Sequence, residues 1–195
     1  MSMVICWLSS DKIKMVGDTQ RTIDINGTLS YPKEPIEKVY AISKSLICGC
    51  TGDAYALQDL SFYVNSCYKK NSSWIPSIDE IVNAICRRFA DRKTNFLIAG
   101  FDVDGLPKAA ICNNNQQPNF VVIKPGDISV FRVLKSPKST DEMIRGILTG
   151  KDDVDQKIAT CIEQTSFIDP SVNSNLFGYQ VMRSGELITL RRKLL

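Results

Sequence analysis

The chain has 195 residues, 44% of them hydrophobic, which is enough for one well-buried core. No shift in composition divides it, so we expect a single domain over residues 1–195. The net charge of +3 is small and the basic residues are scattered, which argues against nucleic acid as a partner. No apolar run approaches a membrane span and the first segment lacks the features of a signal peptide, so we expect a cytoplasmic protein with no membrane partner.

The sequence contains seven cysteines and no histidine. The cysteines are odd in number, show no CxxC spacing and lie in apolar stretches, which predicts buried reduced thiols rather than a metal site. The absence of histidine excludes Ser-His-Asp and Cys-His catalysis. A hydrolase with this composition must take its general base from lysine, a carboxylate or the amino terminus of the chain. We expect no metal and no cofactor.

Residues 1–18 predict a β-hairpin that begins almost at the first residue. An apolar run is followed by the polar break Ser9-Ser10-Asp11 and by a second apolar run that ends in Asp18. A turn centred on Ser10 places Ser2 opposite Asp18, because facing residues of an antiparallel pair have numbers with a constant sum. The start of the chain is therefore a candidate part of a working site.

The next elements alternate between hairpins and helices. Asn26-Gly27 is a strong two-residue turn signal, and a further hairpin turns near Lys44. The elements expected are a strand pair over 19–29, a loop over 31–35, a hairpin over 38–50 that sets Lys38 opposite Gly49 and Cys50, a helix over 53–69 capped by Asp53, and a helix over 78–91 with the capping box Ser77 and Glu80.

The second half continues with strands, two helices and strands. Asp102 and Asp104 lie in a DxDG stretch that we interpret as a turn, because it lacks the remaining ligands of a calcium loop. The elements expected are strands over 95–101 and 108–112, a strand from Phe120, helices over 139–148 and 152–165, and a strand pair over 177–182 and 187–190 around Ser184-Gly185. This order indicates an α+β protein in which antiparallel sheets pack together with helix pairs outside.

A set of motifs in this order resembles the proteasome β-subunit and HslV branch of the N-terminal nucleophile (Ntn) hydrolases. The motifs are Ser2, the apolar run Val4 to Leu8, Gly17-Asp18, Lys38-Val39, Gly49-Cys-Thr-Gly52-Asp53 and the strand Phe96 to Asp102. The similarity extends over roughly the first hundred residues.

The resemblance implies a four-layer αββα sandwich of two antiparallel sheets flanked by helix pairs. It also implies a threonine/serine-type peptidase or amidohydrolase that acts on peptide or protein substrates. Such proteins assemble into rings, so the resemblance implies self-association into a ring-shaped homo-oligomer, with an ATPase as a candidate partner.

The same resemblance assigns roles to individual residues. Ser2 would be the nucleophile, and its α-amino group, with a pKa of about 7.7 to 8.0 in model peptides, would be the general base. Lys38, oriented by Asp18, would lower the pKa of the neighbouring hydroxyl or amine. The backbone N–H of Gly49 would stabilise the oxyanion. Asp169 and Ser171 are the candidates for the late acid and serine of the site.

Departures from the family pattern leave alternatives open. The chain has Ser where the family has Thr, and the family's Gly-Ser-Gly loop is absent from residues 120–131. Retention of Met1 would leave Ser2 without a free amine. The main alternative is a catalytically inactive proteasome-fold homologue that acts as an assembly or binding subunit, and a third is an unrelated α+β binding module.

Overall fold

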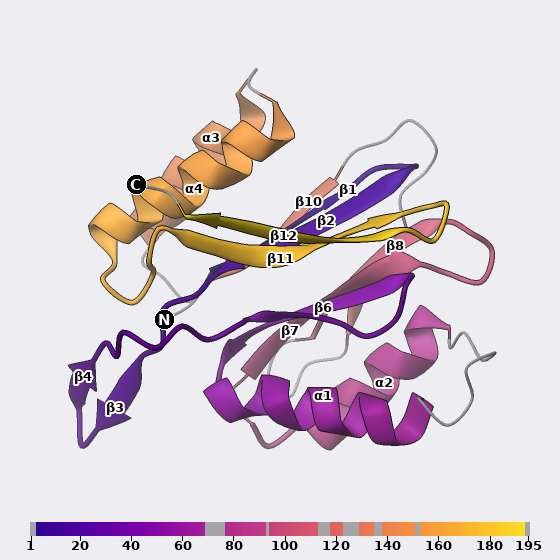
Figure 1. Cartoon of the computed structure of the whole chain (residues 1–195), viewed down its shortest axis with the longest axis horizontal. Coiled ribbons are helices and arrows are strands. Elements are labelled where there is room, and N and C mark those ends of the chain that lie inside the picture. The colour runs from indigo at the N-terminus through magenta and orange to yellow at the C-terminus, as the bar shows by residue number, and fades with distance from the viewer. Residues whose placement is uncertain are drawn as a thin grey trace.

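The computed structural model describes residues 3–68, 77–92, 94–112, 118–122, 129–134, 138–150 and 153–193. These residues form a mixed α+β fold in which helices pack on antiparallel sheets, as the sequence predicts (Figure 1). The helices are α1 (Ala54–Tyr68), α2 (Ile78–Arg88), α3 (Lys138–Thr149) and α4 (Val154–Ile168).

The first five-stranded sheet contains both ends of the described chain. Its spatial order is β10 (Ser129–Leu134), β1 (Met3–Leu8), β2 (Lys12–Asp18), β11 (Asn175–Met182) and β12 (Leu187–Lys193). β1 therefore lies inside the sheet, and all of its residues are buried. This position makes the first described strand part of the core.

The second five-stranded sheet has the order β5 (Val39–Ala41), β6 (Leu46–Gly52), β7 (Thr94–Phe101), β8 (Pro107–Cys112) and β9 (Asn119–Val122). A separate hairpin of β3 (Ile23–Ile25) and β4 (Thr28–Ser30) projects from the body of the molecule (Figure 1). Asn26 and Gly27 both have positive φ, 53° and 84°, as a type I′ turn requires. This turn prediction is confirmed.

Three clusters of buried side chains hold these elements together. One joins α1 and α2 to the second sheet through residues such as Leu60, Ile85 and Phe96. Another lies between the two sheets and includes Val4 and Met15. The third joins α3 and α4 to the first sheet. Figure 1 shows the same arrangement, with α1 and α2 on the opposite side of the molecule from α3 and α4.

The β1–β2 hairpin has a register one residue away from the predicted one. Val4 pairs with Gly17 and Leu8 pairs with Ile13, so facing residues sum to 21 rather than 20. The reason is the turn, in which Ser9 N–H donates to the Lys12 carbonyl at 2.9 Å and leaves a two-residue loop of Ser10 and Asp11. The predicted register is therefore wrong by one residue over the described pairs, and the Met3 N–H donates to Asp18. Ser2, the other member of the predicted facing pair, lies outside the described residues.

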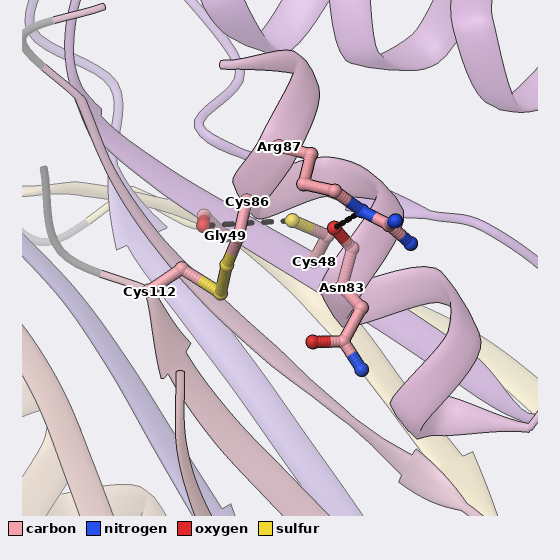
Figure 2. Close-up of a disulfide and its surroundings, with 6 residues drawn as sticks. All are labelled: Cys48, Gly49, Asn83, Cys86, Arg87 and Cys112. Atoms are coloured by element: carbon pink, nitrogen blue, oxygen red, sulfur yellow. Dashed lines mark hydrogen bonds between the residues drawn. A yellow bond between two sulfur atoms is a disulfide. The ribbon is translucent and has the colours of Figure 1, made fainter. Parts of the chain in front are cut away.

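A disulfide links Cys86 of α2 to Cys112 of β8 (Figure 2). The expectation of reduced thiols is wrong for these two residues. The pair could not be read from the sequence, because 26 positions separate the two cysteines and only the packing of α2 on the second sheet brings them together. Cys6, Cys48 and Cys50 are buried and lie outside any disulfide.

The helix starts follow the predicted caps. Asp53 accepts a hydrogen bond from the Tyr55 N–H at 3.0 Å at the start of α1. Ser77 accepts from the Glu80 N–H at 3.2 Å at the start of α2. An oxygen acceptor at this position satisfies a backbone donor that the helix itself leaves without a partner. Both N-cap predictions are confirmed.

The DxDG stretch forms the predicted turn between β7 and β8. Asp102 accepts a hydrogen bond from the Val103 N–H at 2.9 Å, and Asp104 accepts from the Leu106 N–H at 2.9 Å. Both carboxylates are therefore explained by local turn geometry. Among the described residues, no His, Cys, Asp and Glu side chains gather into a group that could hold a metal ion. The described residues also contain no helix long and apolar enough to cross a membrane.

The strand expected from Phe120 divides into two separate strands. β9 ends at Val122 and belongs to the second sheet, whereas β10 pairs with β1 in the first sheet. Hydrophobic pattern alone does not show that a chain changes sheets. Residues 120–131, where the family pattern has its Gly-Ser-Gly loop, lie partly outside the described residues.

Candidate functional site

Asp18 ends β2 as a fully buried carboxylate with three donors around it. One oxygen, Oδ1, accepts the backbone N–H of Met3 at 2.8 Å. The other, Oδ2, accepts the backbone N–H of Gln20 at 2.9 Å and the ammonium of Lys38 at 2.5 Å. Buried charges persist when they are paired and hydrogen-bonded in this way. The Asp18 carboxylate therefore binds both the backbone of Met3 and the ammonium of Lys38.

Lys38 comes from the other sheet, immediately before β5. Its side chain is 6% exposed and its backbone carbonyl accepts the Cys50 N–H at 2.9 Å, so Lys38 lies opposite Cys50, as predicted. The ammonium crosses between the two sheets to reach Asp18. The ion pair therefore fixes the end of β2 against the beginning of β5.

Burial dominates the electrostatics of this pair. It raises the pKa of the Asp18 carboxyl above its ordinary value of 3.8, while the charge of Lys38 and the hydrogen bonds to the carboxylate oppose the rise. Burial also lowers the pKa of Lys38 below its ordinary 10.5, opposed by the charges of Asp18 and, more weakly, Asp169. A lysine with a lowered pKa gives up its proton more readily, which suits a group that works beside a proton transfer.

Two glycines allow the sheets to approach closely beside the ion pair. A Cβ on Gly17 would lie 3.3 Å from Val4 Cγ2 and 3.4 Å from Lys38 Cβ. A Cβ on Gly49 would lie 2.5 Å from Val4 Cγ1 and 2.9 Å from Met15 Sδ. Val4 thus fills the space that both glycines leave. Val4 of β1 therefore packs against Gly49 of the second sheet, and Gly17 of β2 lies against Lys38.

Gly49 occupies an interior position of its sheet. It pairs with Val39 of β5 on one side and with Leu97 of β7 on the other. Close approach to the first sheet is therefore a structural reason for glycine here, as expected for a residue without Cβ. The role of its N–H in binding an oxyanion stays a prediction.

The loop after α4 carries Asp169 and Ser171 and lies near the end of β2 that holds Asp18. Asp169 Oδ1 accepts both the backbone N–H and the hydroxyl of Ser171, at 2.9 and 2.5 Å. Both residues are buried. β11 follows the loop and pairs with β2, setting Leu176 opposite Asp18. Because the pairing is antiparallel, the start of β11, and with it the loop, lies beside the end of β2 that holds Asp18.

Asp169 retains one acceptor without a described donor. Its Oδ2 is buried and has no hydrogen-bond partner among the residues that the structure describes. A buried carboxylate oxygen without a partner is costly, which makes such atoms candidates for a functional contact. Its charge also acts on Lys38. Asp18, Lys38, Asp169 and Ser171 are therefore brought together, whereas Ser2 lies outside the described residues.

No family model matches the chain, and no curated protein matches it.

Asn173 is a structural residue of this cluster that the sequence did not indicate. Its Oδ1 accepts the Thr19 N–H at 3.0 Å, and its Nδ2 donates to the Thr19 hydroxyl at 3.1 Å. These bonds join the loop after α4 to the segment just beyond Asp18. The residues lie 154 positions apart, so no local signal could have paired them.

Proposed function

We propose that the chain is a proteasome-like Ntn amidohydrolase, a serine-type peptidase that uses Ser2 as nucleophile. The observation that carries the proposal is the buried Asp18–Lys38 pair at the start of β1, where Asp18 also accepts the N–H of Met3. The peptide bond joins Ser2 directly to that Met3 nitrogen. The residue that follows the proposed nucleophile in the chain is thus hydrogen-bonded to the buried ion pair.

The proposed fold is the four-layer αββα sandwich of the Ntn hydrolases. It is supported by two antiparallel sheets that share one buried cluster, with α1 and α2 packed on one sheet and α3 and α4 on the other. The proposal extends to self-association into a ring, with peptide or protein substrates and an ATPase as a candidate partner. The family also explains why a hydrolase could lack histidine.

Catalysis would begin once Met1 has been removed. The free α-amine of Ser2 takes the proton of its own hydroxyl as the oxygen attacks the carbonyl carbon of the substrate. A C–O bond forms and the carbonyl becomes an oxyanion, which the Gly49 N–H would stabilise. The ammonium then protonates the leaving amine, the C–N bond breaks, and an ester remains on Ser2. Water hydrolyses this ester by the reverse proton path.

The described residues would support these steps from around the nucleophile. Lys38, fixed by Asp18, places positive charge beside the hydroxyl and favours its ionised form. Asp169 Oδ2, which has no partner among the described residues, would take a hydrogen bond from the Ser2 amine. The bond from the Ser171 hydroxyl holds Asp169 in place for that contact.

A catalytically silent subunit of the same fold is the second candidate. The position of Gly49 favours it, because a residue between two paired strands has its N–H directed into the sheet. In that case the Asp18–Lys38 pair would serve to lock the two sheets. The two candidates differ in whether Ser2 reacts.

The deciding experiment combines mass spectrometry of the N-terminus with peptide hydrolysis by the wild type and Ser2→Ala. We expect loss of Met1, hydrolysis by the wild type and a loss of at least 100-fold in Ser2→Ala, since removing a nucleophile removes a whole catalytic route. An electrophilic peptide inhibitor should add covalently to Ser2. Retained Met1, or equal hydrolysis by both proteins, would eliminate the peptidase and leave the silent subunit.

A further inference from the structure

A groove lies between α4 and the face of the first sheet that α4 covers. Its volume is about 290 Å³, close to the lower limit of about 300 Å³ for ligand pockets. Residues of β2, β11 and β12 form its floor and α4 forms one wall. The groove contains none of the five described residues of the candidate catalytic site, which are Asp18, Lys38, Gly49, Asp169 and Ser171.

The interior of the groove is apolar. Val16 and Ile158 are buried, while Leu176 and Leu190 are partly buried at the side of the core that joins α4 to the sheet. Leu176 and Leu190 leave part of their surface in contact with water. Covering such surface stabilises a complex. The groove therefore favours a ligand with an apolar body.

The open side of the groove has an excess of positive charge. Arg192 is exposed and has no ion-pair or hydrogen-bond partner among the described residues, and β12 sets it opposite Leu176. Its neighbour Arg191 is already engaged, since it bonds Glu37 at 3.1 Å and lies 5.0 Å from the centre of the Phe177 ring. Arg192 is thus the unengaged cation at this end.

The other charges of the groove neutralise each other. Lys14 has only 11% of its side chain exposed and forms an ion pair with Asp155, which lies in the first turn of α4. This pairing removes Asp155 as a source of repulsion for an anion. An anionic group would therefore meet Arg192 above an apolar floor, with the paired Lys14 at the inner side.

We propose that this groove binds a small amphiphilic anion, a carboxylate joined to a short aliphatic body. The guanidinium of Arg192 would pair with the carboxylate, for which its planar donors are well suited. The aliphatic part would lie against Leu176, Leu190 and Ile158. The volume admits a chain of medium length. The inference concerns binding alone and does not depend on hydrolysis by Ser2.

Isothermal titration calorimetry with octanoate and with neutral 1-octanol tests the proposal. We expect octanoate to bind at least tenfold more tightly than 1-octanol to the wild type. Arg192→Ala should weaken octanoate about tenfold and leave 1-octanol unchanged. Arg87→Ala removes another exposed arginine, from α2, and should change neither ligand. Ser2→Ala should bind octanoate as the wild type does, which separates this site from the proposed peptidase.

A second variant locates the ligand. Leu190→Trp places a larger side chain at the edge of the groove, and it should weaken both ligands at least tenfold while circular dichroism and thermal unfolding show a folded protein. Absence of octanoate binding to the wild type would overturn the proposal. So would equal octanoate affinity in Arg192→Ala, or unchanged affinity in a folded Leu190→Trp variant, because the ligand would then bind elsewhere.

Discussion

Two lysine–aspartate pairs involve the same strand, β2, and differ in their surroundings. Asp18 ends the strand and pairs with Lys38, and the two side chains are 0% and 6% exposed. Lys14, four residues earlier, pairs with Asp155, whose side chain is 64% exposed. One pair is enclosed between the sheets and the other opens to water along the groove.

This difference in burial indicates whether an ion pair stabilises the fold or mainly holds groups in position. Removing two charges from water costs several kcal/mol per ion, so a buried pair adds little net stability even when its geometry is good. The Lys14–Asp155 pair keeps the Asp155 side chain in water, so it costs less to form and gains less. The buried Asp18–Lys38 pair therefore makes most sense as a device that holds groups in place, and breaking it should be far more harmful than breaking the exposed pair.

The largest expected effect is that of Asp18→Ala. The substitution leaves the Lys38 ammonium buried without a counter-ion and the N–H groups of Met3 and Gln20 without an acceptor. We expect the free energy of unfolding to fall by about 3–5 kcal/mol, measured by urea denaturation.

The control for this variant is the double substitution Asp18→Asn with Lys38→Met. It removes both charges and keeps a polar acceptor at position 18. At least half of the lost stability should return, because a neutral pair carries no desolvation cost. A loss below about 1 kcal/mol in Asp18→Ala would show that the pair is hydrated and contradict its enclosed position.

The next effect tests the packing around the buried pair. Gly49→Ala would place a Cβ against Val4 Cγ1 at 2.5 Å, and we expect it to lower the free energy of unfolding by about 1–3 kcal/mol. Gly146→Ala is the matched control, since that glycine lies in α3 with no heavy atom within 4 Å of the added Cβ. It should stabilise the protein by about 1 kcal/mol. Equal results in urea denaturation would show that the sheets adjust freely at Gly49.

Much of the fold could be predicted because its signals are local. Asn26-Gly27 determines a turn, and Asp53 and Ser77 begin helices, each through contacts within a few residues. The predicted register of β1 on β2 differs from the observed one by one position. The sequence does not distinguish a two-residue loop from a three-residue loop here, and the hydrogen bond from the Ser9 N–H to the Lys12 carbonyl decides for the two-residue loop. Patterns of hydrophobicity give strands, whereas single hydrogen bonds decide their register.

The candidate site was predictable only in part, and for the same reason. The sequence indicates the hairpins that carry Asp18 and Lys38, whereas the pairing of the two side chains was implied only by the family resemblance. Asp169 arrives through the pairing of β11 with β2, and Asn173 through bonds across 154 positions. The groove beside Arg192 depends on how α4 lies over the sheet. These are long-range contacts, and neither composition nor periodicity encodes them.

The pH dependence of stability offers a smaller and more specific test. The pKa of Asp18 is raised by burial, so the stability that this group contributes is present below pH 3.8 and is lost as the pH rises through its folded value. The pKa of Lys38 is lowered, so its contribution is lost as the pH falls from 10.5 through its folded value.

The stability of the wild type relative to the Asp18→Asn, Lys38→Met variant, measured as the wild-type free energy of unfolding minus that of the variant, should therefore be lowest between pH 3.8 and pH 10.5. It should change by about 1.4 kcal/mol for each unit of pKa shift. Urea denaturation across the pH range measures it. If the wild type is instead most stable relative to the variant near neutral pH, the attraction between the two charges outweighs the cost of burying them.

The smallest effect is expected for Asp155→Ala. Its carboxylate is exposed, so we expect a loss of at most about 1 kcal/mol at low salt, decreasing towards zero near 1 M NaCl, where the Debye length is about 3 Å. The loss in Asp18→Ala should hardly change over the same range, because salt screens buried pairs poorly. If both losses respond equally to salt, the two pairs do not differ as their surroundings indicate. Asp155→Ala also leaves Lys14 as a second unpaired cation in the groove, so the same variant should bind octanoate more tightly than the wild type does.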